Sequence, residues 1–175
     1  MRVLLMVVIA VMTTACAATG ARPQPFPAGR SAAEAGGPTR PDGAVGTTGT
    51  PSGYEVSGTA LDLRGTPYRN GGMDPNGFDC SGFVWYVFTR HGLSLPRTVE
   101  DQWRVGGTVE ASDLQPGDLV FFTTTSPGAS HVGIVIGGDS FIHAPSSSGV
   151  VRVERLGASY WSSRYVGAKR VLQAF

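Results

Sequence analysis

The stretch Gly77-Phe78-Asp79-Cys80-Ser81-Gly82-Phe83-Val84-Trp85-Tyr86-Val87-Phe88 decides how this chain folds, because it places a cysteine at the start of an apolar helix. Its apolar residues recur at the spacing of one helix face, namely Phe83, Val84, Val87 and Phe88. Asp79 is a favoured N-cap, so Cys80 is expected in the first turn. Free backbone N–H groups and the helix dipole favour a thiolate there. The pattern predicts a nucleophile, although a lone cysteine is more often a buried apolar residue.

Two further helices are expected around this one. Upstream, a short helix is indicated by Val56, Ala60, Leu61 and Leu63. Downstream, Gly92 should end the cysteine helix, and a third helix should run over 98–104 with Thr98 and Asp101 as a capping pair.

The pattern changes to strands after Pro116 and Gly117. Apolar, β-prone segments are expected at 118–123, 131–136, 141–144, 150–155 and 165–172. Helices followed by a run of strands predict an α+β fold, with N-terminal helices packed on an antiparallel sheet of about five strands.

Two of the three histidines are placed to assist the cysteine. His91 stands at the far end of the cysteine helix, about 16 Å from Cys80 at 1.5 Å per residue, so no function is assigned to it. His131 and His143 lie on consecutive strands joined through residues 137–139. A two-residue turn would place them on opposite faces, whereas a longer loop or a bulge makes them diagonal neighbours on one face. We therefore predict the loop or bulge, and a cysteine–histidine–histidine site.

The chain begins with a segment typical of export. Arg2 precedes an apolar run over 3–12, and small residues then lead to Cys16. This order predicts a signal peptide over 1–15, because the run is shorter than the roughly 20 residues of a membrane span. An uncleaved anchor is the alternative. A disulfide between Cys16 and Cys80 is also open on the sequence alone.

Residues 16–52 are rich in Gly, Pro, Ala and Thr and include six of the twelve prolines. Such a segment cannot bury enough apolar surface to fold, so a disordered tether is expected before a catalytic domain over 53–175. The formal net charge is +1 without a basic stripe, which argues against a nucleic-acid partner.

The motifs resemble those of a known family. They are Tyr68-Arg69-Asn70-Gly71-Gly72, Gly77 to Val84, Leu95-Pro96-Arg97 with Gln102, Pro116 to Phe122, His131-Val132-Gly133-Ile134 and Phe141-Ile142-His143-Ala144. In this order they resemble the NlpC/P60 family of papain-like cysteine peptidases, which cleave peptidoglycan peptide stems. The resemblance covers nearly all of 53–175.

The resemblance implies a role for each residue. Cys80 matches the nucleophile, His131 the base and His143 the third polar residue. Tyr68 matches a tyrosine that helps to hold the oxyanion, and Asp79 and Ser81 match residues near the substrate.

The N-terminus resembles a bacterial lipobox, in which the cysteine, here Cys16, receives diacylglycerol. It departs from that pattern at Thr13, where leucine is usual, and Ala17 is not the aspartate that retains lipoproteins at the inner membrane. The layout is similar to murein endopeptidase lipoproteins of the Spr/MepS type. It implies an exported protein anchored by lipid in the cell envelope, at the outer membrane facing the periplasm in a Gram-negative cell.

The expected activity is a murein endopeptidase whose partners are peptidoglycan peptide stems and, through the anchor, the membrane. The motifs do not decide between D,D-crosslinks and bonds after D-glutamate, and they identify no adaptor. An amidase or acyl transferase with the same three residues, or a non-catalytic wall-binding scaffold, are the alternatives. No cofactor or metal is expected, because one cysteine and two histidines without an acidic ligand make a poor zinc set.

Overall fold

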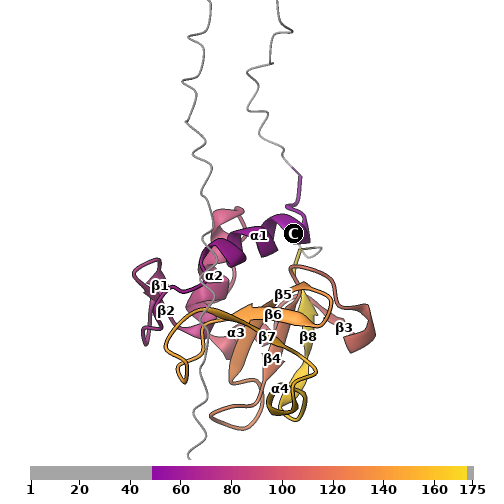
Figure 1. Ribbon diagram of the computed structural model, residues 1–175. Helices are drawn as coiled ribbons and strands as arrows, with labels where there is room; N and C mark the ends of the chain where they lie inside the picture. Colours follow the sequence, from indigo (N-terminus) through magenta and orange to yellow (C-terminus); the bar gives the residue numbers. More distant parts are fainter. Residues whose placement is uncertain (1–48, 173–175) are drawn as a thin grey trace, which may run out of the picture. The chain divides into compact units, whose positions relative to one another are not determined.

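The computed structural model describes residues 49–172, which form an α+β fold with helices α1 and α2 packed on the sheet (Figure 1). The helices are α1 Gly53–Asp62, α2 Cys80–Arg90, α3 Val99–Trp103 and α4 Ser159–Ser162, with a 3-10 turn η1 at Ala111–Asp113. The strands are β1 Met73–Asp74, β2 Gly77–Phe78, β3 Gly107–Val109, β4 Leu119–Phe122, β5 His131–Gly137, β6 Ser140–His143, β7 Arg152–Arg155 and β8 Tyr165–Arg170.

The expected start and end signals of α2 are confirmed. The side chain of Asp79 accepts a hydrogen bond from the backbone N–H of Gly82 at 2.7 Å, which satisfies one of the free donors of the first turn. Gly92 follows the last turn with φ +76°, a conformation that glycine adopts without strain. The four residues of the expected apolar face are all fully buried. Cys80 is therefore the first residue of a well-anchored helix.

The other two expected helices also form. Ser52 and Glu55 make a reciprocal capping box at the start of α1, and Val56 and Ala60 face the core. Thr98 caps α3 by accepting from the backbone N–H of Asp101.

The main sheet has six antiparallel strands in the order β3-β8-β4-β5-β6-β7. The five expected strands form with ends within two residues of those expected. The sixth, β3, pairs only with β8. It was not expected because its three residues are too few to show an alternating pattern. The β1–β2 hairpin and α4 were also not expected, because strands of two residues and a helix of four are too short to show any periodic pattern.

Both faces of the sheet are buried, which explains why β4 reads as an uninterrupted apolar run. One face packs against α1 and α2 through residues that include Leu119, Phe121, Val132, Ile134 and Ile142. The opposite face carries a smaller cluster formed by Val120, Phe122, Val135, Phe141, Trp161 and Ala168.

The β5–β6 hairpin contains the predicted irregularity. Ile134 pairs with Ile142 and Val135 with Phe141, and the register then shifts so that Gly137 pairs with Ser140. The extra residue is a β-bulge, which sets the register that puts His131 and His143 on one face. The prediction of a loop or bulge is confirmed.

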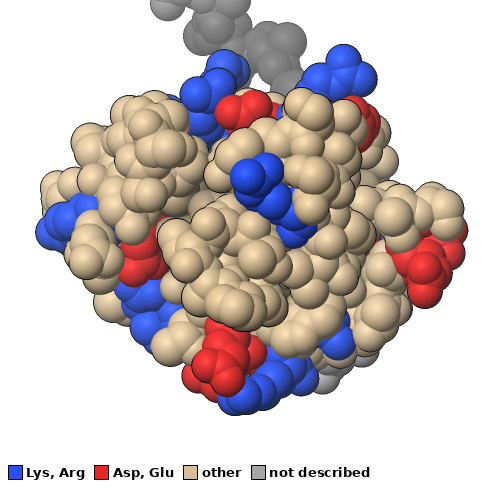
Figure 2. Space-filling view, turned by 90° about the horizontal axis from the view of Figure 1, so that it is seen from below, with Lys and Arg blue, Asp and Glu red and all other residues tan. Residues whose placement is uncertain are grey.

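Basic and acidic side chains lie in small separate groups on the face drawn in Figure 2, and most of that face is uncharged. Within residues 49–172, no helix is both long and apolar enough to span a bilayer. The predicted signal peptide, Cys16 and all of the tether up to residue 48 lie outside the described residues.

Candidate active site

The structure brings Cys80 against the start of strand β5. Helix α2 packs on β5, and the backbone N–H of Val132 acts on the Cys80 sulfur as a hydrogen-bond donor that lowers its pKa. Val132 directly follows His131 in the chain. The head of α2, where the nucleophile is expected, therefore lies at the start of β5, the strand whose first residue is His131.

The electrostatic environment of Cys80 differs from the one expected. Burial is the largest influence and raises the pKa of the thiol to about 11, and the carboxylate of Asp79 acts in the same direction. Backbone N–H groups of Ser81, Val132 and Cys80 lower the pKa by a smaller amount. The helix start supplies donors that favour the thiolate, whereas burial and the Asp79 carboxylate favour the protonated thiol in the ligand-free protein.

His131 and His143 are directly hydrogen-bonded to each other. Nε2 of His131 lies 2.6 Å from Nδ1 of His143, and both residues are buried. Burial lowers the pKa of His131 to about 4, and burial together with the nearby His131 lowers the pKa of His143. Both rings are therefore neutral at neutral pH. The hydrogen bond between them uses Nε2 of His131, so Nδ1 of His131 is not engaged by His143.

The indole of Trp161 covers the histidine pair. Its ring stacks on His131 at 5.6 Å between centroids and meets His143 edge-on at 4.8 Å. Only 7% of Trp161 is exposed, so it excludes water from this side of the pair. Trp161 lies on the short helix α4.

Tyr68 approaches Cys80 from the segment before β1. Burial raises the pKa of its hydroxyl, and negative charge on Cys80 and Asp79 raises it further. Tyr68 and Cys80 both pack against the main core cluster. Its backbone is held by a 2.7 Å hydrogen bond to the carbonyl of Gly149.

Asp79 and Ser81 flank Cys80, and both are held by Arg97. The guanidinium of Arg97 lies 2.6 Å from Oδ2 of Asp79 and donates to Oγ of Ser81 at 2.8 Å. It also reaches the carbonyl of Gly72. Through these contacts, Arg97 forms an ion pair that braces the loop before α2.

Gln102 is a further positioning residue, which was noted only as part of a motif. Its amide nitrogen donates to the carbonyls of Ser81 and Pro96, at 3.0 and 2.8 Å, and the residue is fully buried. It thereby fixes α3 to the first turn of α2. An isolated glutamine gives no sequence signal for such a contact, because it depends on how two helices pack.

His91 lies away from these residues at the end of α2, where its Nε2 is 2.9 Å from Oγ1 of Thr59. No group of three or more His, Cys, Asp or Glu side chains suited to a metal ion occurs within residues 49–172.

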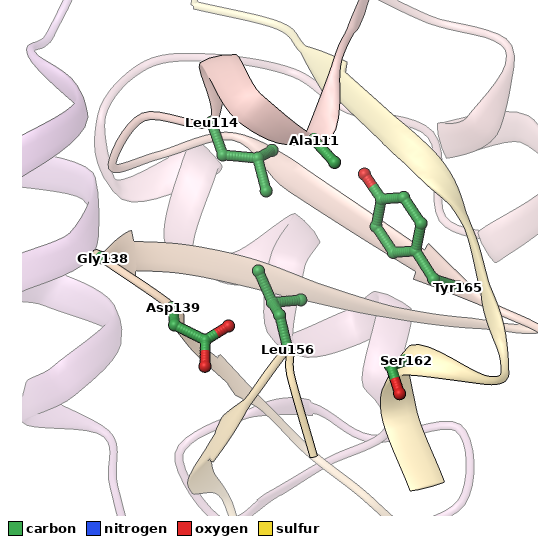
Figure 3. Close-up of a pocket in the computed structure, with 7 residues that line it drawn as sticks. All are labelled: Ala111, Leu114, Gly138, Asp139, Leu156, Ser162 and Tyr165. Atoms are coloured by element: carbon green, nitrogen blue, oxygen red, sulfur yellow. The ribbon is translucent and has the colours of Figure 1, made fainter. Parts of the chain in front are cut away.

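Two concave regions lie next to helices α4 and α3. One hollow, of about 410 Å³, has Leu114 and Leu156 facing each other across it, as Figure 3 shows. The Tyr165 hydroxyl at its wall is buried without a protein partner. The other is a groove of about 480 Å³ between α3 and the loop joining β4 to β5.

The chain resembles known proteins over most of the residues that the structure describes. The profile described as the NlpC/P60 family matches residues 65–170. The chain is 48% identical over 112 residues to the probable peptidoglycan endopeptidase LytE of Bacillus subtilis, over 63% of this chain and 32% of that protein. It is 46% identical over 112 residues to the murein DD-endopeptidase MepS/murein LD-carboxypeptidase of Escherichia coli, over 63% of this chain and 58% of that protein.

The fold is likewise similar to a solved structure. An NlpC/P60 family protein from Bacillus cereus superposes with a TM-score of 0.66 at 35% identity, over 70% of this chain and 41% of that one. The chain thus spans between about a third and three fifths of the lengths of these proteins.

Proposed function

Because the chain belongs to the NlpC/P60 family, we propose that it is a cysteine-type endopeptidase that hydrolyses peptide bonds of peptidoglycan. One observation supports this above all others: a cysteine at the head of α2 packs against the strand that begins with His131, and His131 is hydrogen-bonded to a second histidine. A nucleophile, a base and a group that orients the base are the three parts of a thiol peptidase site.

The hydrogen bond between the histidines, together with the proposed role of His131 as the base, determines their tautomers. For His131 to accept a proton at Nδ1, its Nε2 must carry a hydrogen and donate it to Nδ1 of His143. The hydrogen of His143 is then on its Nε2, which is buried without a protein partner. His143 is thus a positioning residue that keeps Nδ1 of His131 free.

The reaction proceeds through an acyl-enzyme. The sulfur of Cys80 attacks the scissile carbonyl carbon as its proton passes to His131, because the thiol is protonated at rest. The resulting imidazolium gives that proton to the leaving nitrogen, and the C–N bond breaks. Water then loses a proton to His131 and attacks the thioester, which releases the carboxylic acid and restores the thiol.

The oxyanion that forms in both steps is stabilised by the backbone N–H of Cys80 and the hydroxyl of Tyr68. A donor of this kind contributes about 3–4 kcal/mol to the transition state. The raised pKa of Tyr68 keeps the phenol protonated, as a donor must be.

The D,D-crosslink between peptide stems is the bond we assign, in preference to a bond after D-glutamate. The relative MepS, named a murein DD-endopeptidase, supports this assignment at 46% identity. We further propose that the protein is exported and anchored in the cell envelope by lipid on Cys16, on the grounds of the signal-like segment 1–15.

Digestion of defined muropeptides by the purified protein tests the activity, with Cys80→Ala as the matched control. We expect the crosslinked dimer to be cut by the wild type and not by the variant, with masses that show water added at the D,D-bond. Product masses that report cleavage after D-glutamate would redirect the bond assignment.

Other product patterns separate the alternatives. Transfer of the acyl group to an added amine would indicate an acyl transferase, and release of the stem from the glycan an amidase. Retained wall binding without turnover would indicate a scaffold. Mass spectrometry of the N-terminal peptide after expression in a bacterium tests the lipid on Cys16, with Cys16→Ser as control.

A further inference from the structure

Tyr68 belongs to a short extended segment whose backbone is bonded on both sides. On one side, Tyr68 pairs with Phe78 of β2, a fully buried residue whose ring packs edge-on against Phe83 at 5.7 Å between centroids. The backbone N–H of Arg69 donates to the carbonyl of Phe78 at 2.9 Å. This side of the segment is therefore fixed to the core.

On its other side, the segment pairs with the loop over 144–151, which joins β6 to β7. Pro67 forms an antiparallel bridge with Val150, and the backbone N–H of Tyr68 donates to the carbonyl of Gly149 at 2.7 Å. Gly149 and Val150 are exposed. Water can compete for a bond at the surface, so this bond depends on the conformation that the loop itself prefers.

The two neighbours of the segment lead directly to the residues of the site. Strand β2 ends at Phe78, two residues before Cys80, and the loop begins directly after His143. Backbone pairing thus connects the segment before the nucleophile, the segment of Tyr68 and the segment after the second histidine. Cys80 is held by a helix and His143 by the main sheet, whereas Tyr68 is held by these isolated bridges.

Gly149 has a backbone conformation that favours glycine. Its φ is +73°, in the left-handed region that other L residues adopt only at a cost. Apart from its own chain neighbours, no atom lies within 4 Å of the place where a Cβ would stand. An alanine would therefore meet no obstacle there, and would act only by disfavouring this conformation. The carbonyl of Gly149 turns with its backbone, so the bond to Tyr68 would weaken.

We infer that Gly149 is a positioning residue that acts through Tyr68: its left-handed conformation aims the carbonyl that holds Tyr68, and so sets where the phenol hydroxyl meets the oxyanion. This inference depends on the proposed function, in which that hydroxyl is an oxyanion donor. A donor acts only when it is aimed at the oxyanion, and a displacement of about 1 Å can lower a rate by about 10²-fold. The exposed loop over 144–151 thus influences the chemistry through one backbone bond.

Gly149→Ala tests the inference, and Gly92→Ala is the matched control. Gly92 has nearly the same φ, +76°, is also exposed, and likewise has no atom within 4 Å of the place of a Cβ. It follows α2, where its N–H donates to the carbonyl of Thr89. The two variants therefore introduce the same backbone strain, and only Gly149→Ala introduces it at the bond that holds Tyr68.

Hydrogen exchange at the backbone amide of Tyr68 is the first measurement, because it does not require activity. Its protection should fall by about 10-fold or more in Gly149→Ala and stay at the wild-type level in Gly92→Ala. Urea denaturation of both variants corrects for any change in global stability. Unchanged protection in Gly149→Ala would overturn the inference.

Steady-state kinetics on a crosslinked muropeptide are the second measurement. Tyr68→Phe should lower kcat by about 10²-fold, and Gly149→Ala by about 5- to 20-fold with little change of KM, because the donor is displaced and not removed. Gly92→Ala should keep the wild-type kcat. Combined with Tyr68→Phe, Gly149→Ala should cause no further loss, since the hydroxyl that it positions is absent.

The remaining outcomes are distinguishable. Additive losses in the double variant would mean that Gly149 acts on another group, and equal losses in the two alanine variants would indicate general strain; either result overturns the inference. A wild-type rate in Tyr68→Phe would instead refute the oxyanion role of Tyr68, and a wild type without turnover would refute the proposed function. If circular dichroism shows that Gly149→Ala is unfolded, Gly149→Asn replaces it with smaller expected changes, because asparagine tolerates the left-handed region.

Discussion

At the scale of single residues, the site is governed by how burial and hydrogen bonding oppose each other at Cys80. Desolvation and the Asp79 carboxylate favour the thiol, while three backbone N–H groups favour the thiolate. Burial also keeps His131 neutral and thus able to accept a proton. In the resting site, Cys80 and His131 are therefore both uncharged. The thiolate–imidazolium ion pair forms only as the sulfur attacks.

Neutralising Asp79 should lower the pKa of Cys80. Asp79→Asn keeps an N-cap oxygen but removes the negative charge that destabilises the thiolate, and it leaves Arg97 uncompensated beside the sulfur. The rate of alkylation by iodoacetamide should then rise at a lower pH than in the wild type. Asp62→Asn, at the exposed end of α1, is the control. Superimposable pH profiles for the wild type and Asp79→Asn would refute this electrostatic account.

Replacing His143 separates its positioning role from a structural one. In His143→Ala, nothing accepts the Nε2 hydrogen of His131, so kcat should fall by about 10²- to 10⁴-fold with little change of KM. His143→Asn offers a side-chain oxygen at that place and should recover part of the loss. Steady-state kinetics on a crosslinked muropeptide measure both. Equal activity of the alanine and asparagine variants would contradict the tautomer assignment.

At the scale of elements, strand ends and helix starts bring the functional groups together. Cys80 is the first residue of α2, His131 the first of β5 and His143 the last of β6. The bulge in the β5–β6 hairpin is the local feature that lets the two histidines share a face. A buried ion pair between Asp118, just before β4, and Arg170, the last residue of β8, ties two neighbouring strands together at 2.7 Å.

Breaking that ion pair should destabilise the sheet strongly. Asp118 is 1% exposed and also accepts a hydrogen bond from the backbone N–H of Gln115, so Asp118→Ala removes the carboxylate that Arg170 pairs with and the acceptor of the Gln115 N–H. We expect the free energy of unfolding to fall by about 3–5 kcal/mol, measured by urea denaturation. Asp113→Ala, an exposed carboxylate in η1, serves as comparison. A loss below about 1 kcal/mol would mean that water replaces the carboxylate.

At the scale of the whole molecule, the sheet separates two apolar clusters, and the histidine pair lies on the face of the smaller one, beneath Trp161. Enclosing two titratable rings in this way links the stability of the fold to pH. The tryptophan that covers the rings comes from α4, a helix of only four residues.

Acid should destabilise the fold through these histidines. Burial depresses their pKa values in the folded protein, so as pH falls from about 6.5 towards 4 the unfolded chain takes up protons that the folded protein does not. Each histidine should contribute a loss of about 1.4 kcal/mol per pH unit within this window. Urea denaturation at several pH values measures the slope. The double variant His131→Gln/His143→Gln should have a shallower slope, and an unchanged slope would refute this assignment.

The sequence by itself determined the parts of this protein that depend on local rules. The cap at Asp79, the stop at Gly92, the apolar face of α2 and the five longer strands follow from propensity and periodicity over adjacent residues. The bulge also followed, because only an irregular hairpin could keep His131 and His143 on one face. The motifs named the residues that we predict for the site, among them Cys80, His131 and His143.

Only the tertiary structure decided how these parts act on one another. The stacking of Trp161 on His131, the contact of Gln102 with Ser81 and the pairing of Arg97 with Asp79 join segments far apart in sequence, and no local pattern encodes them. The raised pKa of the Cys80 thiol has the same origin. Desolvation depends on everything packed around the sulfur, whereas the helix dipole is a property of α2 alone.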